Sequence, residues 1–140
     1  NCKKAINAYE EALKVYTFER LPTQYATTQN NLGNAYRTLA EVEVEAKAEN
    51  CKKAIKACEE ALKVRTFERF PMDYAMTQNN LGNAYGTLAE VEAKAENCKN
   101  AFRAYAEAQK VFTEKEFPEM YLRVKCNLKR TLTFCEGNKL

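Results

Sequence analysis

The chain has 140 residues, of which 46% are hydrophobic and 29% charged, and this composition is ordinary for a folded globular domain. Its 22 basic and 19 acidic residues leave a net charge of +3, which is too small to indicate nucleic acid as a partner. No apolar run approaches the roughly 20 residues that span a bilayer, and no signal peptide or transit segment opens the chain, so we expect no membrane association.

The sequence repeats itself. The string TQNNLGNAY occupies residues 28–36 and recurs at residues 77–85. Residues 1–43 differ from residues 50–92 at eight positions only, and a third, more divergent copy starts at Asn97. Self-similarity at this spacing is typical of proteins built from stacked repeats, in which each unit buries its apolar face against its neighbours.

Helical periodicity runs through each copy, and the prolines mark where alternate helices begin. Pro22, Pro71 and Pro118 each open a helix, because the missing N–H costs nothing in a first turn. Gly33 and Gly82 lie in mid-helix, where we expect them to allow close approach of a neighbouring helix. The charged, alanine-rich segment 43–49 is predicted to be a bent, helix-prone connection. The six predicted helices span residues 1–19, 22–42, 48–69, 71–92, 95–116 and 118–136.

The chain carries six cysteines and no histidine, so a zinc site would need clustered cysteines, and there is no C-x-x-C pair. Three cysteines occupy one repeat position, and the other three are single occurrences. We predict buried free thiols in a reducing compartment, and hence a cytoplasmic protein. The cysteines are Cys2, Cys51, Cys58, Cys98, Cys126 and Cys135.

The two ends of the chain differ. The first helix corresponds to the second helix of a unit, so its partner is missing. We expect either a fragment of a longer array or an open face on residues 2–16 that meets another molecule, including a second copy of the chain. At the other end Lys129 replaces the glycine of the earlier units, which is typical of a capping helix with no further neighbour.

These motifs resemble the tetratricopeptide repeat (TPR) family. The family pattern of Leu-Gly-x-x-Tyr, then Ala-x-x-x-Phe/Tyr-x-x-Ala, then Pro maps onto the sequence twice, with Cys58 at the aromatic position of the first copy. The first copy comprises Leu32, Gly33, Tyr36, Ala54, Cys58, Ala61 and Pro71, and the second comprises Leu81, Gly82, Tyr85, Ala101, Tyr105, Ala108 and Pro118. Gln29 and Gln78 stand where the family often has an aromatic residue. The units of 49 and 47 residues also exceed the usual length of about 34, and in this they look like the repeats of kinesin light chains and of arrays attached to caspase-like domains.

The resemblance implies an all-α protein, a right-handed superhelical solenoid of six helices in antiparallel pairs. We expect one domain over residues 1–140. Its parts are the second helix of a truncated unit (1–20), two units (22–69 and 71–116) and a C-terminal capping helix (118–140). The family binds other proteins, so the resemblance points to a protein-interaction module and not to an enzyme.

Asparagines recur on the face opposite the apolar stripe of the proline-starting helices. Asn30, Asn34, Asn79 and Asn83 form a column, which we call the asparagine column. Asparagine is a poor helix former, and its amide both donates and accepts hydrogen bonds, which suits an extended peptide backbone. In TPR relatives this helix lines a concave peptide-binding groove. The alternative is a solvated polar stripe whose amides bond one another between layers.

The remaining candidate residues flank the asparagine column. Arg123 and Arg130 continue it into the last helix and would favour an acidic peptide or a free C-terminal carboxylate, unless they simply cover an exposed terminal helix. The predicted peptide-binding residues are completed by Thr27, Arg37 and Met76. We predict no catalytic residues, cofactor or metal, because no known catalytic motif is present. The competing hypothesis is a structural, self-associating module within a larger protein.

Overall fold

A computed structural model describes residues 1–137, and this part of the chain folds into α-helices without a strand. The prediction of an all-α protein with six helices is confirmed for these residues. The elements are α1 (Cys2–Ala12), α2 (Pro22–Val42), a 3-10 turn η1 (Val44–Ala46), α3 (Lys47–Leu62), α4 (Pro71–Ala89), α5 (Lys94–Gln109) and α6 (Pro118–Glu136).

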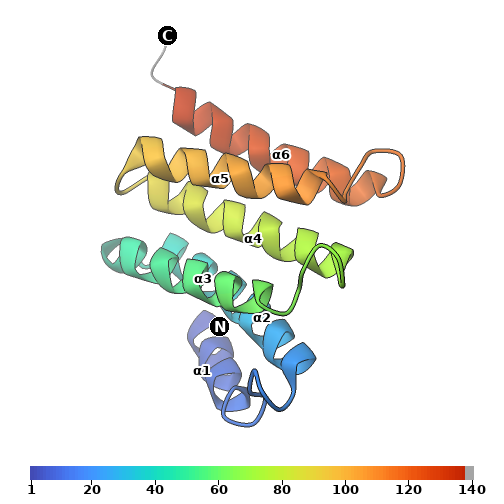
Figure 1. The fold of residues 1–140 in the computed structure, drawn as a ribbon. Helices are drawn as coiled ribbons and strands as arrows, with labels where there is room; N and C mark the ends of the chain where they lie inside the picture. The colour runs from blue at the N-terminus through green and yellow to red at the C-terminus, as the bar shows by residue number, and fades with distance from the viewer. Residues whose placement is uncertain (138–140) are drawn as a thin grey trace.

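Successive helices run antiparallel and lie one above another, with α1 at one end and α6 at the other (Figure 1). Each helix packs against its neighbours in the chain, and α4 also contacts both α2 and α6. The three proline-starting helices therefore form a continuous row, with α4 between its two counterparts. This row positions the candidate site described below.

The starts of the proline-starting helices agree with prediction. The residues before the prolines, Leu21, Phe70 and Phe117, have φ near −137° and ψ near 68°, outside the helical region. A proline excludes the helical conformation from the residue before it, so each helix begins at the proline itself.

The ends of the other three helices were predicted wrongly. Helices α1, α3 and α5 end at Ala12, Leu62 and Gln109, each seven residues before the predicted end. A threonine explains the early end, because the Thr66 hydroxyl accepts a hydrogen bond from the backbone N–H of Arg69 at 3.2 Å. Thr17 and Thr113 do the same in the other two copies. A threonine hydroxyl that bonds the backbone stabilises a turn in competition with the helix.

The core lies between the helices and combines many small side chains with a few large ones. One cluster joins α3 to α4 and includes Ala54, Cys58 and Leu81. A second joins α4, α5 and α6 around Tyr105 and Phe112, which are buried almost completely. Alanine and cysteine are short, so the backbones of paired helices approach closely where these residues meet.

Both mid-helix glycines lie where a helix crosses its partner, as predicted. A Cβ atom on Gly33 would lie 2.8 Å from Cys58 Sγ, and one on Gly82 would lie 2.6 Å from a ring carbon of Tyr105. Neither position has room for a side chain.

Of the six cysteine predictions, two hold and three are wrong, while Cys2 is a free thiol as predicted but only half-buried. Cys51 and Cys58 are buried free thiols, and burial raises the pKa of the Cys51 thiol to about 11 and that of Cys58 to about 12. Cys98 and Cys135 instead form a disulfide, and Cys126 is an exposed free thiol. Burial was the only criterion used to predict free thiols, and it did not take into account that Cys135 lies on the side of α6 that faces Cys98.

The glycine contacts give a stability prediction within a single helix. We expect Gly82→Ala to lower the free energy of unfolding by about 1–3 kcal/mol, because the new methyl group overlaps the buried Tyr105 ring. Thermal unfolding followed by far-UV circular dichroism measures the change.

Gly86→Ala is the matched control, because Gly86 lies in the same helix and its added Cβ would meet only the side chain of Thr131, with Oγ1 at 3.0 Å and Cγ2 at 3.3 Å, and no aromatic ring. It brings the same gain in helix propensity, about 1 kcal/mol. Equal melting temperatures for the two variants would show that Gly82 is not required for close packing.

Candidate binding groove

A hollow of about 530 Å³ runs across the row formed by α2, α4 and α6, and we call it the polar groove. It is the place where eight of the nine predicted binding residues meet; Thr27 is the exception. The lining residues are Asn30, Asn31, Asn34, Arg37, Glu41, Met76, Asn79, Asn80, Asn83, Arg123, Asn127 and Arg130.

Helical spacing explains why these side chains converge. On α6, Arg123, Asn127 and Arg130 are four and three residues apart, so they project from one side of the helix. The same spacing applies to the lining residues of α2 and α4. Because the three helices lie in one row, their polar sides form one continuous surface.

The asparagine oxygens hold the helices together. Asn30 Oδ1 accepts hydrogen bonds from Thr77 Oγ1 at 2.9 Å and from Asn80 Nδ2 at 3.0 Å, which joins α2 to α4. Asn79 Oδ1 accepts from Asn127 Nδ2 at 3.2 Å, which joins α4 to α6. For these oxygens, the structure therefore agrees with the alternative hypothesis, in which the polar side chains of neighbouring layers hydrogen-bond one another.

The asparagine nitrogens are differently placed. Within residues 1–137, the Nδ2 atoms of Asn30 and Asn79 donate to no other side chain, and Asn34 makes no side-chain hydrogen bond. Among the fully buried polar side-chain atoms of the described residues, only Arg37 Nε lacks a hydrogen-bond partner. The unpartnered amide nitrogens are therefore not fully buried, and solvent can reach them. They can donate to a ligand without breaking the helix–helix bonds.

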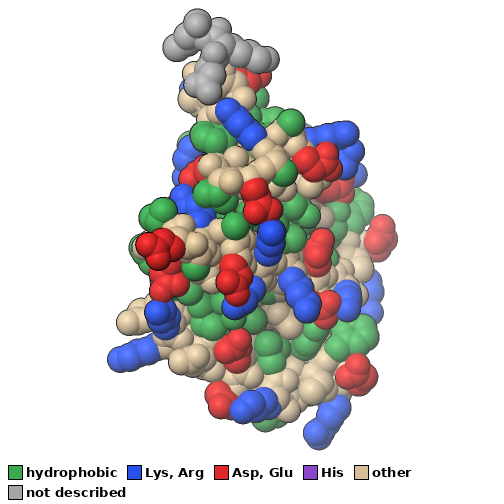
Figure 2. All heavy atoms as spheres, turned by 90° about the vertical axis from the view of Figure 1, so that its left-hand side faces the viewer, with side chains coloured by type: hydrophobic (Ala, Val, Ile, Leu, Met, Phe, Trp, Pro, Cys, Tyr) green, Lys and Arg blue, Asp and Glu red, His purple; other side chains and the backbone are tan. Residues whose placement is uncertain are grey.

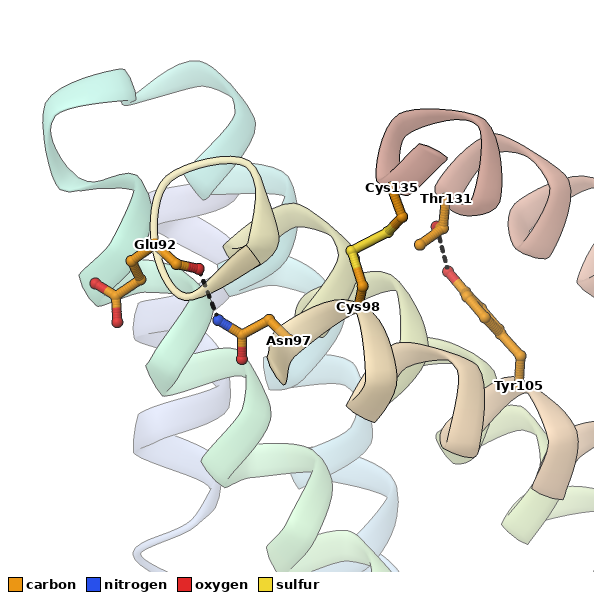
Figure 3. Close-up of a disulfide and its surroundings, with 6 residues drawn as sticks. All are labelled: Glu92, Asn97, Cys98, Tyr105, Thr131 and Cys135. Carbon is orange, nitrogen blue, oxygen red and sulfur yellow. Dashed lines mark hydrogen bonds between the residues drawn. A yellow bond between two sulfur atoms is a disulfide. The ribbon is translucent and has the colours of Figure 1, made fainter. Parts of the chain in front are cut away.

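Asn83 has a mainly structural position. Its Oδ1 accepts a hydrogen bond from the Tyr105 hydroxyl at 2.6 Å, and burial raises the pKa of this tyrosine. The same hydroxyl lies 3.3 Å from Thr131 Oγ1, so one tyrosine of α5 connects α4 with α6 (Figure 3).

Thr27 lies outside the polar groove and belongs to a network that the sequence analysis missed. Its Oγ1 accepts a hydrogen bond from Arg65 Nη2 at 3.2 Å, and Arg65 Nη1 donates to Thr77 Oγ1 at 3.1 Å. Arg65 is only 8% exposed, and burial lowers the pKa of its guanidinium. The signal was present in the repeat, because the equivalent positions hold the aromatic residues Tyr16 and Phe112.

Positive charge exceeds negative charge in the polar groove. Three guanidiniums line it against one carboxylate, that of Glu41, which pairs with Arg37 at 3.0 Å. Arg123 and Arg130 form no ion pair with any described residue, and Arg130 Nη2 donates only a 3.4 Å hydrogen bond to Asn127. The groove therefore attracts an anion most strongly on its α6 side. Lys125 and Lys129 do not line it.

Charges elsewhere are mixed. On the face shown in Figure 2, basic and acidic side chains alternate with no large area of one sign. Several of them pair, as Lys47 does with Glu90 at 2.9 Å and Lys52 with Glu92 at 3.1 Å. This face therefore has no concentration of positive charge like that on the α6 side of the polar groove.

The described residues form neither a metal site nor a membrane-spanning segment. No cluster of three metal-binding side chains occurs among residues 1–137, and no helix there is both long and apolar enough to cross a membrane. Comparison of the chain with protein-family models, with curated proteins and with solved structures finds no match.

The contacts of the asparagine column predict unequal effects of substitution on stability. Asn30→Ala removes two interhelical hydrogen bonds from a buried residue, so we expect it to lower the free energy of unfolding by about 1–3 kcal/mol. Urea denaturation measures this value.

Asn34→Ala, on the same helix, should change the free energy of unfolding by less than about 0.5 kcal/mol, since Asn34 is exposed and makes no described side-chain bond. An equal loss in both variants would contradict the division of roles between them.

Proposed function

We propose that this chain is a TPR-like, right-handed superhelical solenoid that binds an extended peptide of a partner protein in the polar groove. The single observation that carries the proposal is the set of asparagine amide nitrogens that lie free in a groove crossing three helices. The repeated Leu-Gly-x-x-Tyr and Ala-x-x-x-Tyr motifs and the contacts among the proline-starting helices support the architecture.

An extended peptide presents carbonyl oxygens that need hydrogen-bond donors. Asn30, Asn34 and Asn79 offer such donors from two neighbouring helices, and they do so regardless of the ligand's side chains. The oxygens of Asn30 and Asn79 are held by α4 and α6, so these two amides are oriented before a ligand arrives. Less conformational entropy is then lost on binding.

The charge of the groove narrows the ligand class. Arg37, Arg123 and Arg130 favour a segment that carries an acidic side chain or a free C-terminal carboxylate, because a guanidinium binds a carboxylate through two parallel hydrogen bonds. Met76 adds a partly exposed apolar contact for a neighbouring side chain of the ligand.

A display library of random peptides with free C-termini tests this function. We expect the wild-type chain to enrich acidic peptides and the double variant R123A/R130A to bind them about tenfold or more weakly, since each lost charged hydrogen bond costs about 1.5–3 kcal/mol. Fluorescence anisotropy of a selected peptide measures the change in Kd.

The double variant K14A/K110A is the control, because it removes the same charge from ion pairs on the outer surface. It should bind the selected peptide within about twofold of the wild type. No enrichment, or equal weakening in both double variants, would refute the groove as the binding site.

Self-association is the second candidate function, and the exposure of the segment after α1 favours it. Val15 is 60% exposed, whereas its repeat equivalent Val64 is 9% exposed, because Val64 packs against Ala26 of α2 and none of the described helices covers Val15 in the same way. Such an apolar face can meet a second copy of the chain or the rest of a larger protein.

Sedimentation velocity over a range of concentrations separates the two candidates. The peptide-binding proposal expects a monomer throughout. Growth in mass with concentration that Val15→Lys abolishes would favour self-association instead, and the exposed Lys63→Ala change serves as a control that leaves this face intact.

The remaining proposals concern partners and location. We propose no enzymatic activity and no nucleic-acid or membrane partner, on the grounds of the missing catalytic motifs and the balanced charge. A cytoplasmic location is part of the proposal; the four free thiols favour it, and the Cys98–Cys135 disulfide counts against it.

A further inference from the structure

The last helix is joined covalently to the stack. The disulfide between Cys98 and Cys135 connects the first turns of α5 with the last turn of α6 (Figure 3). In the two preceding units the equivalent pairs are a cysteine and a leucine: Cys2 with Leu39, and Cys51 with Leu88. Each of these pairs lies within one apolar cluster. The disulfide thus replaces an apolar contact that the repeat makes twice.

Without this disulfide, few contacts would hold helix α6 against the rest of the stack. It contacts only α4 and α5 among the described helices, and only two of its residues, Val124 and Thr131, are buried. Helix α4 buries twelve. A segment with few buried contacts opens locally at a lower free energy than the rest of a protein.

Helix α6 also supplies one wall of the polar groove. Arg123, Asn127 and Arg130 all lie on it, and the 3.2 Å bond between Asn127 and Asn79 is its described polar link to the asparagine column. Motion of the second half of α6 would move Asn127 and Arg130 away from α4. The disulfide therefore fixes the most cationic part of the groove.

We propose that the Cys98–Cys135 disulfide is a redox switch, and that its reduction by a small thiol frees the C-terminal half of α6 and weakens ligand binding in the polar groove. The release of α6 is inferred from the small number of its buried residues and neighbouring helices. The effect on binding rests on the proposed function. This is a regulatory role for the terminal helix.

The chemistry balances with a thiol such as glutathione. A first thiolate attacks the Sγ atom of Cys135, a half-buried residue, and expels the Cys98 thiolate, leaving a mixed disulfide. A second thiolate attacks the small-molecule sulfur and expels the Cys135 thiolate. Both cysteines take up protons, so two thiols become one disulfide while the protein gains two thiols. Glutathione disulfide reverses the reaction.

Four cysteines remain as free thiols, and one of them, the half-buried Cys2, lies on α1 at the opposite end of the stack from the disulfide (Figure 1). Cys51 and Cys58 are buried and stay protonated, since burial raises the pKa of both thiols. Cys126 is exposed on α6. Replacing it by serine removes the one exposed free thiol of the described residues, so the experiment uses C126S as its background.

Hydrogen exchange read by mass spectrometry tests the release of α6. On adding dithiothreitol, we expect amides in residues 127–136 to exchange about tenfold or more faster, while those in α4 keep their rates. Oxidation with glutathione disulfide should restore the slow rates. Thiol titration before and after reduction verifies that two thiols appear.

Cys135→Leu is the matched control, because it restores the cysteine–leucine pair found in the two preceding units. Its exchange should not respond to dithiothreitol. If α6 exchange in the C126S chain stays unchanged after the bond is reduced, if C135L responds in the same way, or if the oxidised chain has no disulfide, the switch is refuted.

A fluorescein-labelled hexaglutamate peptide tests the coupling to the groove. We expect its Kd to rise about threefold to tenfold on reduction in the C126S chain and to stay constant in C135L. Faster α6 exchange with an unchanged Kd would refute the coupling. If hexaglutamate binds neither the oxidised nor the reduced chain, the proposed preference for acidic ligands is wrong. The hydrogen-exchange experiment then still decides whether reduction releases α6.

Discussion

The close approach of paired helices at Gly33 and Gly82 is the contact on which the rest of the structure depends. Without a side chain at these positions, Cys58 and Tyr105 lie against the helix backbone itself. The helix pairs are therefore thin, and alanine and cysteine make up much of the apolar core between them. The same contact fixes the rotation of α2 and α4 about their axes, which turns their asparagines away from the core and into one groove.

Within that groove a single residue type has two functions. The oxygens of Asn30 and Asn79 join neighbouring helices, and their nitrogens are left for a ligand. Asparagine suits this division because its side chain accepts and donates from separate atoms. Asn83 departs from the pattern, since its oxygen binds the Tyr105 hydroxyl and thereby couples the groove to α5.

Much of the fold follows from local sequence, and the site only in part. The prolines predicted the starts of α2, α4 and α6, because a proline acts on its own neighbours. The early ends of α1, α3 and α5 depend on a threonine hydroxyl that competes with the helix, as at Thr66. Eight of the nine peptide-binding residues that were predicted from the repeat line the polar groove. The position of Thr27 and the disulfide depend on contacts across helices, with Arg65 and between Cys98 and Cys135, that no local pattern specifies.

The buried guanidinium of Arg65 also bears on how a chain with two nearly identical segments folds in one register. In its own place Arg65 donates to Thr27 and Thr77. If α3 occupied the place of α5, the equivalent partners would be Met76 and Val124, which accept no such hydrogen bonds. A buried charge without partners costs several kcal/mol, so this exchange is strongly disfavoured. Phe112, the counterpart of Arg65, lies instead in an apolar cluster with Val124. One arginine thus distinguishes the two copies, because its hydrogen-bond partners are present in only one of the two places.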